Sequence, residues 1–491
     1  MQDTVPDDLR DRSVRGGSAI LAGQGLRFFL TFASQIVLAR LLSPSEFGIV
    51  AMVAPILGMV QLFTDFGLGH AVVQRGKIDQ TELSTVFWLN IALSVGVAIL
   101  FAALSPAIAW MYGEPRVAMV ALASSLMIII GGTGQLHGFL VSRNMHFTRI
   151  AIIDASSLIL GVTAGIVSAV AGLGYWSLVV NQAVASLTTA VLNWIYSGWK
   201  PGRPGHWRPI AAMLRYGGDI TGMKLVQYLS ISVDKTLIGI RVGEAGLGIY
   251  DRAWKLGWAP FSQLAVPVDR LAFPILSRLN DDPERYRNIF TLLFQVLAFI
   301  IMPGMLFAVF KAEAVIGLLF GPRWLAMTPI FQWITLGTMA MPISMAASWL
   351  FMSQARTKQY FTCTGIASCV TILAYLVGLR WGAVGVAAAA TISLYLVQLP
   401  LFVVVSTRVG HVSPGVMVQA LGPVGLALGA AALTLTAINQ TFVLGGVLGI
   451  FVALIGTYAA AVVALATVPS GRAFMGRASG LLSTLRRRKS A

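Results

Sequence analysis

Two segments of the sequence that lie 200 residues apart carry polar side chains at matching positions. The first segment contains Gln24, Arg27, Ser34 and Gln35, and the second contains Lys224, Gln227, Asp234 and Lys235. In a helix these positions fall within about 100° on one face, and the other faces are mainly apolar. An ionisable group within a membrane is costly, so it normally faces the bundle interior or a water-filled cavity. The shared stripe therefore predicts a polar cavity lined by two similar halves, an arrangement that many transporters have.

The predicted cavity carries more positive than negative charge. Arg27, Lys224 and Lys235 are opposed in the stripe by Asp234 alone. Such an excess attracts an anion, and phosphate is the group that clusters of Arg and Lys commonly hold.

A second charged group follows at Asp251, Arg252 and Lys255. Asp251 and Lys255 are four residues apart in the order that favours a helical ion pair. Two interpretations stay open. Asp251 and Lys255 could form a structural ion pair, or they could line the substrate cavity together with Arg252.

Asp234 also has two interpretations. A carboxyl group in a cavity of low dielectric has a raised pKa, and a neighbouring lysine lowers it, so Asp234 could exchange a proton or Na⁺ during transport. The alternative is that Asp234 neutralises Lys235 and holds its helix in place.

The composition identifies an integral membrane protein. Hydrophobic residues make up 57% of the 491 residues and charged residues only 11%, against roughly 25% charged in soluble chains. The net charge of +16 does not indicate nucleic acid binding, because no separate soluble domain is expected to carry it.

Apolar runs of about 20 residues, long enough to cross a bilayer, predict about fourteen transmembrane helices. We expect them at 17–41, 45–64, 83–105, 117–141, 149–170, 174–197, 214–240, 246–274, 288–310, 324–353, 359–379, 383–406, 415–437 and 442–468. The expected organisation is an N-terminal lobe, a C-terminal lobe, a last helix pair and a basic cytoplasmic tail, at 1–200, 201–410, 411–470 and 471–491.

The repeat and the loop charges give this map an orientation. Gly48 recurs as Gly248, and further on Gly113 recurs as Gly321. Six helices in each half mean that the lobes are related by an axis along the membrane normal. Most loop Lys and Arg residues fall on one side, which the positive-inside rule makes cytoplasmic. Both termini are therefore expected in the cytoplasm, with the first helix retained as an anchor.

Catalytic and metal-binding motifs are absent from the sequence. The five histidines are scattered, and no HExxH, GxSxG, Walker or CxxC pattern occurs. We therefore expect neither an enzyme nor a bound metal or cofactor, apart from the coupling ion considered for Asp234.

Several runs resemble one transporter family. They include SVDKTLIG at 232–239, LGIY at 247–250, and the first-half run LARLLSP at 38–44 that leads to EFG at 46–48. In these runs the chain resembles the polysaccharide-exporter (Wzx-type) branch of the multidrug/oligosaccharidyl-lipid/polysaccharide superfamily. The resemblance implies an all-α, V-shaped, MATE-like bundle of two six-helix lobes, to which this chain adds two C-terminal helices.

The resemblance also implies a function. Proteins of this branch translocate undecaprenyl-diphosphate-linked oligosaccharides across the inner membrane for lipopolysaccharide or exopolysaccharide biosynthesis. In this interpretation the basic residues, Arg252 and Lys255 included, meet the diphosphate, while Gln24, Gln35 and Gln227 meet sugar hydroxyl groups. The expected partners are the lipid-linked substrate, membrane lipid, a polysaccharide polymerase and the export machinery.

Two other functions are weaker alternatives. A cation-coupled multidrug exporter of the same superfamily would need an acidic, aromatic cavity, whereas basic groups prevail here. A membrane polysaccharide polymerase or ligase would need a sizeable external loop, and all the expected external loops are short.

Overall fold

The computed structural model describes residues 25, 27–65, 72, 78–205, 208–408, 410–441 and 446–489, and every regular element in these ranges is helical. Packing divides the chain into two compact units, Met1–Gly248 and Ile249–Ala491. Each unit has its own hydrophobic core. The expected all-α class is confirmed, while the lobe boundaries at 200 and 410 stay predictions.

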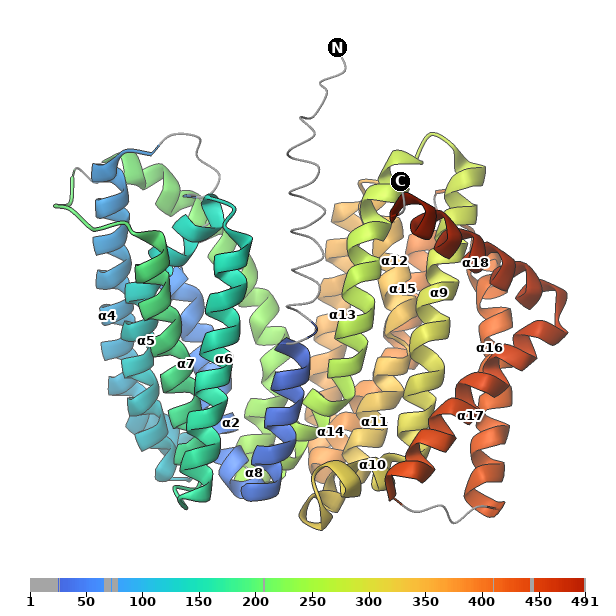
Figure 1. Ribbon diagram of the computed structural model, residues 1–491, viewed down its shortest axis with the longest axis horizontal. Helices are drawn as coiled ribbons and strands as arrows, with labels where there is room; N and C mark the ends of the chain where they lie inside the picture. The colour runs from blue at the N-terminus through green and yellow to red at the C-terminus, as the bar shows by residue number, and fades with distance from the viewer. Residues whose placement is uncertain are drawn as a thin grey trace. The chain divides into compact units, whose positions relative to one another are not determined.

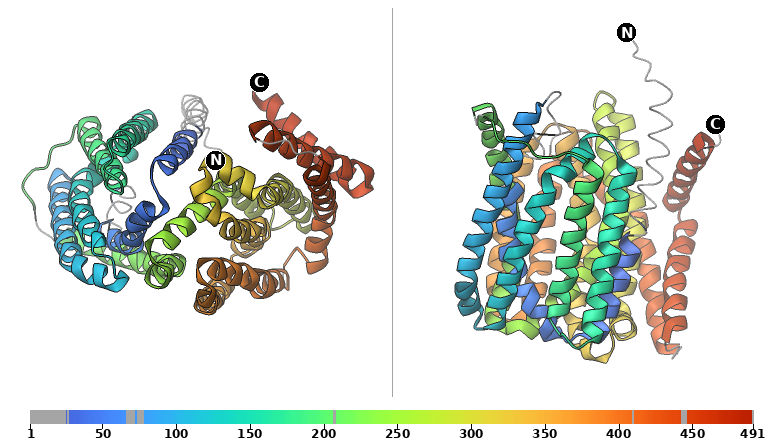
Figure 2. Two further views of the ribbon diagram at one scale, coloured as in Figure 1. Left: turned by 90° about the horizontal axis from the view of Figure 1, so that it is seen from below. Right: turned by 60° about the vertical axis from the view of Figure 1, so that its left-hand side comes forward.

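Unit 1 consists of a helix that ends at Leu41, the helices α2 to α7, and the first part of α8 (Figure 1). The bounds are α2 Pro44–Asp65, α4 Gln80–Tyr112, α5 Arg116–Arg143, α6 Phe147–Val170, α7 Trp176–Ser197 and α8 Arg208–Arg278. The packed pairs α4–α5, α5–α7 and α6–α7 run side by side (Figure 2). A Cβ atom at Gly134 would lie 2.5 Å from Cα of Ala190, so small residues set the spacing between α5 and α7.

The segment that follows α7, residues 198–205, forms a linker that lies against the start of α4. The backbone N–H groups of Gly202 and Gly205 donate to the hydroxyl groups of Ser84 (2.9 Å) and Thr85 (2.7 Å). The indole of Trp88 donates to the carbonyl of Gly202 at 3.0 Å. The linker therefore has a fixed course along unit 1, although it lacks regular secondary structure.

The long helix α8 is interrupted at Gly243. Its φ of 86° and ψ of −175° lie in a region that side-chain-bearing residues rarely adopt. The break separates the two predicted spans 214–240 and 246–274, and it turns the chain tightly at Glu244.

Unit 2 contains the rest of α8 and the helices α9 to α18. Their bounds are α9 Pro283–Phe310, α10 Ala312–Leu319, α11 Thr328–Met339, α12 Met341–Ser353, α13 Thr357–Gly378, α14 Gly382–Ser393, α15 Leu399–Thr407, α16 Pro414–Thr441, α17 Gly446–Thr467 and α18 Pro469–Lys489. A π-helical turn, Leu394–Gln398, joins α14 to α15, so one predicted span, 383–406, corresponds to both helices.

The core of unit 2 contains several aromatic side chains that are almost fully buried. Tyr286, Phe290, Phe294 and Trp349 have exposed fractions of 1% or less. The two polar tips are satisfied, because the hydroxyl group of Tyr286 lies 2.5 Å from that of Ser353 and the Trp349 indole donates to Asp269 at 2.8 Å.

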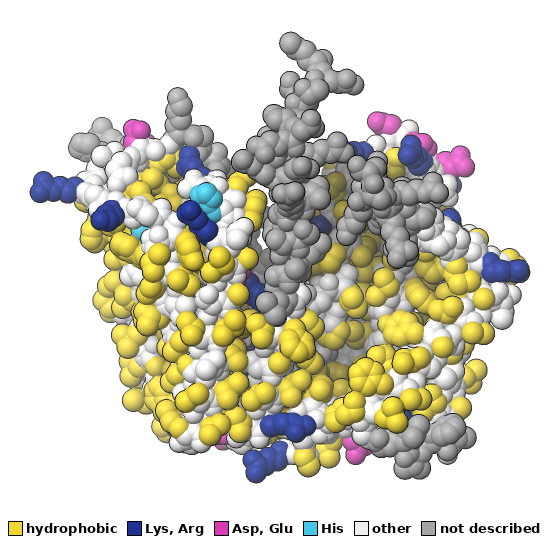
Figure 3. Space-filling model, viewed as in Figure 1, with side chains coloured by type: hydrophobic (Ala, Val, Ile, Leu, Met, Phe, Trp, Pro, Cys, Tyr) yellow, Lys and Arg dark blue, Asp and Glu magenta, His cyan; other side chains and the backbone are white. Residues whose placement is uncertain are grey.

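Ten segments of the described chain are long and apolar enough to cross a membrane. One of them, Thr357–Thr407, contains two of the predicted spans. On the face shown in Figure 3, hydrophobic side chains cover most of the middle of the surface, and most Lys and Arg side chains lie near its upper and lower edges. The chain is therefore a multi-pass integral membrane protein. The total of fourteen spans stays a prediction, since the first, 17–41, lies largely outside the described residues.

The linker contacts predict protected amide hydrogens. In the double variant Ser84→Ala/Thr85→Val the N–H groups of Gly202 and Gly205 lose their acceptors, so their hydrogen exchange should become at least about tenfold faster. Mass spectrometry of the purified protein in detergent measures this exchange. Ser168→Ala, which removes a hydroxyl group bonded only within its own helix, should leave it unchanged; equal exchange in all three proteins would contradict the proposed attachment.

Candidate functional site

Two repeat-related glycines bring α2 and the α8 turn into backbone contact. A Cβ atom at Gly48 would lie 1.7 Å from the carbonyl oxygen of Glu244, and one at Gly248 would lie 1.9 Å from that of Pro44. The contact is reciprocal, because each glycine meets the residue four positions before the other. This reciprocity gives a physical reason for the repetition of glycine at an offset of 200 residues.

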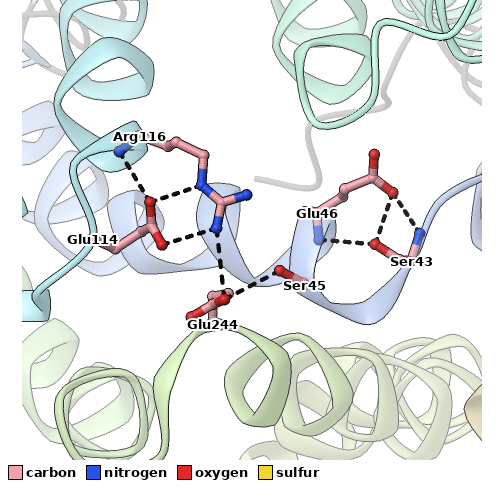
Figure 4. Close-up of polar contacts among 6 residues, drawn as sticks. All are labelled: Ser43, Ser45, Glu46, Glu114, Arg116 and Glu244. Carbon is pink, nitrogen blue, oxygen red and sulfur yellow. Dashed lines mark hydrogen bonds and ion pairs between the residues drawn. The ribbon is translucent and has the colours of Figure 1, made fainter.

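A polar cluster surrounds this crossing (Figure 4). The guanidinium group of Arg116 donates to both carboxylate oxygens of Glu114, at 2.7 and 2.9 Å. It also forms an ion pair with Glu244 at 3.6 Å, and the hydroxyl group of Ser45 donates to Glu244 at 3.3 Å. The cluster therefore joins the α4–α5 turn, the start of α2 and the α8 turn.

Local structure places these groups. The α4–α5 turn begins at Gly113, whose φ of 67° suits a glycine, and it presents Glu114 beside Arg116. At the start of α2 the carboxylate of Glu46 accepts from the backbone N–H and the hydroxyl group of Ser43, at 2.6 and 2.8 Å, and so closes the first turn.

Glu114 lies in the short turn between two membrane-spanning helices. The hydrogen bonds from Arg116 hold the pKa of Glu114 below its ordinary value of 4.5, and partial burial opposes this effect. Glu114 is therefore ionised at neutral pH, and its negative charge forms part of the cluster.

The predicted stripe residues have different surroundings in unit 1. Arg27 forms an ion pair with Asp154 of α6 at 2.9 Å, with exposed side-chain fractions of 62% and 45%. Asp234 is buried, with 2% exposed, and accepts from the backbone N–H of Lys235 at 2.7 Å. Gln35 is half-buried. The positive charge of Arg27 is therefore matched by a carboxylate on another helix.

The other stripe positions lie outside what the structure describes. Gln24 belongs to the undescribed start of the chain, and the side chains of Lys224 and Gln227 are not among those described on α8. A common cavity for Arg27, Lys224 and Lys235 accordingly stays a prediction.

In unit 2, Asp251 holds two cations. Its carboxylate lies 2.8 Å from the guanidinium group of Arg252 and 2.7 Å from the ammonium group of Lys255. The ion pair expected from the spacing of Asp251 and Lys255 is therefore present. Side-chain exposure is 4% for Asp251 and 10% for Arg252 but 39% for Lys255. The formal charges of the three residues sum to +1, and Lys255 is the most accessible of them.

The sequence did not single out the cluster of Figure 4. Glu114, Arg116 and Glu244 belong neither to the polar stripe nor to the charged group at 251–255. The repeat match at Gly113 and the EFG motif at 46–48 pointed to the right turns, but they did not identify the side chains that meet there.

Comparison with known protein sequences identifies a family. The sequence profile described as "Polysaccharide biosynthesis protein" matches residues 37–329, which is more than half of the chain. The lipopolysaccharide biosynthesis protein WzxC of Escherichia coli (strain K12) is 26% identical over 398 residues, which cover 80% of this chain and 79% of that protein. The succinoglycan biosynthesis transport protein ExoT of Rhizobium meliloti (strain 1021) is 26% identical over 325 residues, covering 66% of this chain and 65% of that protein.

Solved structures identify the fold. The lipid II flippase MurJ, in an inward closed conformation, aligns with a TM-score of 0.72 at 14% identity and covers 90% of this chain and 97% of that one. An inward-facing multidrug resistance transporter of the MATE family, from the MOP superfamily, aligns with a TM-score of 0.57 at 16% identity. The alignment covers 84% of this chain and 96% of that one. The chain therefore has the fold of these transporters.

The glycine contact predicts a steric effect at Gly248. In Gly248→Ala the added methyl group meets the backbone of Pro44, which cannot rotate away, so the free energy of unfolding should fall by about 1–3 kcal/mol. Gly222→Ala on the same helix meets nothing within 4 Å and should be neutral or slightly stabilising. Thermal unfolding in detergent compares the two, and a Gly248→Ala protein as stable as the control would refute the close crossing.

The Glu114–Arg116 ion pair predicts a dependence of stability on pH. A carboxyl group whose pKa is lowered by folding stabilises the protein above its ordinary pKa, and this contribution is lost as the pH falls through the lowered value. Glu114→Gln should therefore reduce the stability by up to about 1 kcal/mol at pH 7, and the difference from wild type should shrink below pH 4.5. Thermal unfolding between neutral and acid pH measures both.

The exposed Glu313, at the start of α10, provides the control for this experiment. Glu313→Gln should follow wild type at every pH. A difference between wild type and Glu114→Gln that does not vary with pH would count against the ion pair as its cause.

Proposed function

The chain belongs to the family of polysaccharide biosynthesis proteins, and we propose that within it the protein is a flippase for undecaprenyl-diphosphate-linked oligosaccharides. It would move them across the bacterial inner membrane during lipopolysaccharide or exopolysaccharide biosynthesis, with both termini in the cytoplasm. The names of two relatives, a lipopolysaccharide biosynthesis protein and a succinoglycan transport protein, support this proposal, as does the fold of a lipid II flippase. The fold and the family are those of transporters, so the protein is not an enzyme.

The observation that carries the proposal is the positive charge around Asp251. The two cations outnumber the carboxylate, so the formal charges of the three residues sum to +1, and a positive group of this kind suits an anion such as the diphosphate of a lipid-linked sugar. Lys255 would make the first contact, since it is the exposed member. Arg252 would stay with Asp251 and fix the position of the carboxylate that orients Lys255.

The cluster of Figure 4 would take part in the transport cycle. The sequence map places Glu114, Arg116 and Glu244 at the external ends of their helices. Alternating access requires the external side of a transporter to open and close, and the contacts of Glu244 with Arg116 and Ser45 are exposed enough to break and form again. We assign these contacts to a closed state of unit 1.

The architecture proposed for this cycle retains the two six-helix lobes and the extra C-terminal helix pair. The diphosphate head group would cross inside the protein while the polyprenyl chain stays in lipid. A polysaccharide polymerase and the export machinery would then receive the substrate on the outer side. Asp234 is proposed either as the group that exchanges H⁺ or Na⁺ or as the residue that holds Lys235; its burial is compatible with both roles.

A multidrug exporter is the less favoured alternative. Cationic drugs need acidic or aromatic partners, whereas the carboxylate of Asp251 is already bound by Arg252 and Lys255. A likeness to the MATE fold does not separate the two functions, since it concerns the arrangement of helices alone.

The proposal predicts a loss of transport in Lys255→Gln. Removing a charged hydrogen-bond donor that contacts the diphosphate should weaken its binding by about 1.5–3 kcal/mol, which corresponds to roughly tenfold or more. Flipping of an undecaprenyl-diphosphate-linked oligosaccharide in proteoliposomes provides the measurement. Lys255→Arg keeps the charge and should retain most of the activity. Wild-type rates in a stably folded Lys255→Gln protein would reject this assignment of Lys255.

A further inference from the structure

Unit 1 contains a pocket of about 660 Å³ that is lined by four amide side chains. Gln61 comes from α2, Gln135 from α5, and Asn181 and Gln182 from α7. The volume falls within the range of about 300–1,000 Å³ that small-molecule sites occupy. All three helices are among the segments long and apolar enough to cross a membrane, so a polar pocket between them needs a reason.

Among the side chains that the structure describes, no Asp, Glu, Lys, Arg or His lines this pocket. The described lining thus offers neutral amides rather than a cation for a diphosphate or an acid for a cationic drug. Each amide offers two N–H donors and a carbonyl acceptor. A ligand that matches four such groups carries many neutral groups that both donate and accept, and sugar hydroxyl groups have this property.

Contacts with neighbouring helices fix the positions of the helix segments that form the pocket wall. On α5 the carbonyl of Gly132 accepts from the buried amide of Asn90 at 3.0 Å, and the carbonyl of Thr133 accepts from the indole of Trp194 at 2.8 Å. On α7, Asn181 packs against a glycine of α6, because a Cβ atom at Gly165 would lie 2.8 Å from its Cβ atom. The walls are thus positioned by neighbouring helices, and no ligand is needed to position them.

Three of the pocket amides have unused hydrogen-bonding capacity. Within the described part of the chain, no hydrogen bond joins the side chain of Gln61, Asn181 or Gln182 to another residue. Gln61 and Gln182 are exposed residues. Amides kept in this state between membrane helices can bind a hydrophilic ligand without first breaking contacts within the protein.

We propose that this amide pocket binds an uncharged sugar residue of the transported glycan, while the diphosphate is bound elsewhere. The inference rests on the proposed flippase function and adds the class of group that unit 1 recognises. Apolar residues of the wall, such as Leu57 and Met127, would contact the C–H face of the sugar ring. The four amides would contact its hydroxyl groups.

The test uses two probes with the purified full-length protein in detergent. The methyl glycosides of glucose, galactose and mannose report on the pocket, and inorganic pyrophosphate reports on the site of Lys255. Saturation-transfer NMR measures the glycosides, and calorimetry measures pyrophosphate. We expect at least one of the neutral glycosides to bind to wild type.

Gly131→Leu fills the pocket, because the nearest atom to a Cβ at Gly131 is the hydroxyl oxygen of Ser186, 4.0 Å away. This variant should weaken glycoside binding at least tenfold and leave pyrophosphate binding unchanged. Gln182→Leu, on the exposed side of the pocket, should also weaken glycoside binding and serves as the second variant if Gly131→Leu does not fold. Gly96→Leu on α4, where a Cβ meets nothing within 4 Å, is the control and should bind both probes like wild type.

The results separate this inference from the proposed function. Lys255→Gln should lose pyrophosphate binding and keep glycoside binding. If no neutral glycoside binds to wild type, or if Gly131→Leu and Gln182→Leu bind glycosides like wild type, the sugar pocket is wrong even where the liposomes show flipping. If wild type flips no lipid-linked oligosaccharide, the flippase proposal is wrong whatever the glycosides do.

Discussion

The structure depends on one constraint, which is that a charge among membrane helices must be neutralised by a partner or reach water. The described residues meet it in three ways. Arg27 and Asp154 cancel each other across two helices. Asp251 binds two cations, a group with a formal charge of +1, whereas Arg116 is shared by two carboxylates, a group with a formal charge of −1. Charge of each sign is thus concentrated at a few positions, and the rest of the helical surface can face lipid.

The sequence predicted the features that come from periodicity and repetition. Gly48 and Gly248 were recognised as equivalent, and the contact of each with the residue four positions before the other shows why glycine is needed at both. The class of fold followed from the apolar runs. Partners on distant helices could not be predicted, because a helical period gives the face of a residue but not its neighbour. Arg27 illustrates this, since its carboxylate partner, Asp154, comes from α6.

The cluster of Figure 4 and the amide pocket were missed for related reasons. Glu114 and Glu244 are 130 residues apart in the sequence, yet both contact Arg116, Glu244 from the turn where α8 breaks at Gly243. The pocket amides come from three helices and share no spacing in the sequence. Single glutamine and asparagine residues in apolar helices are also weak signals, since they carry no charge whose cost requires an explanation. Such sites become visible only when the packing of the helices is known.

A neutral pocket and a cationic group place different demands on a transporter of lipid-linked glycans. The diphosphate is common to such substrates, and a cation that binds it must be balanced by a carboxylate such as Asp251, so replacing one member leaves a buried charge. A neutral amide needs no carboxylate to balance it, so the replacement of the exposed Gln61 or Gln182 leaves no buried charge. The names of two relatives refer to different polysaccharides, lipopolysaccharide and succinoglycan. Recognition by neutral amides would let selectivity for the sugar change at little cost to the fold, while the charged group continues to bind the part that all substrates share.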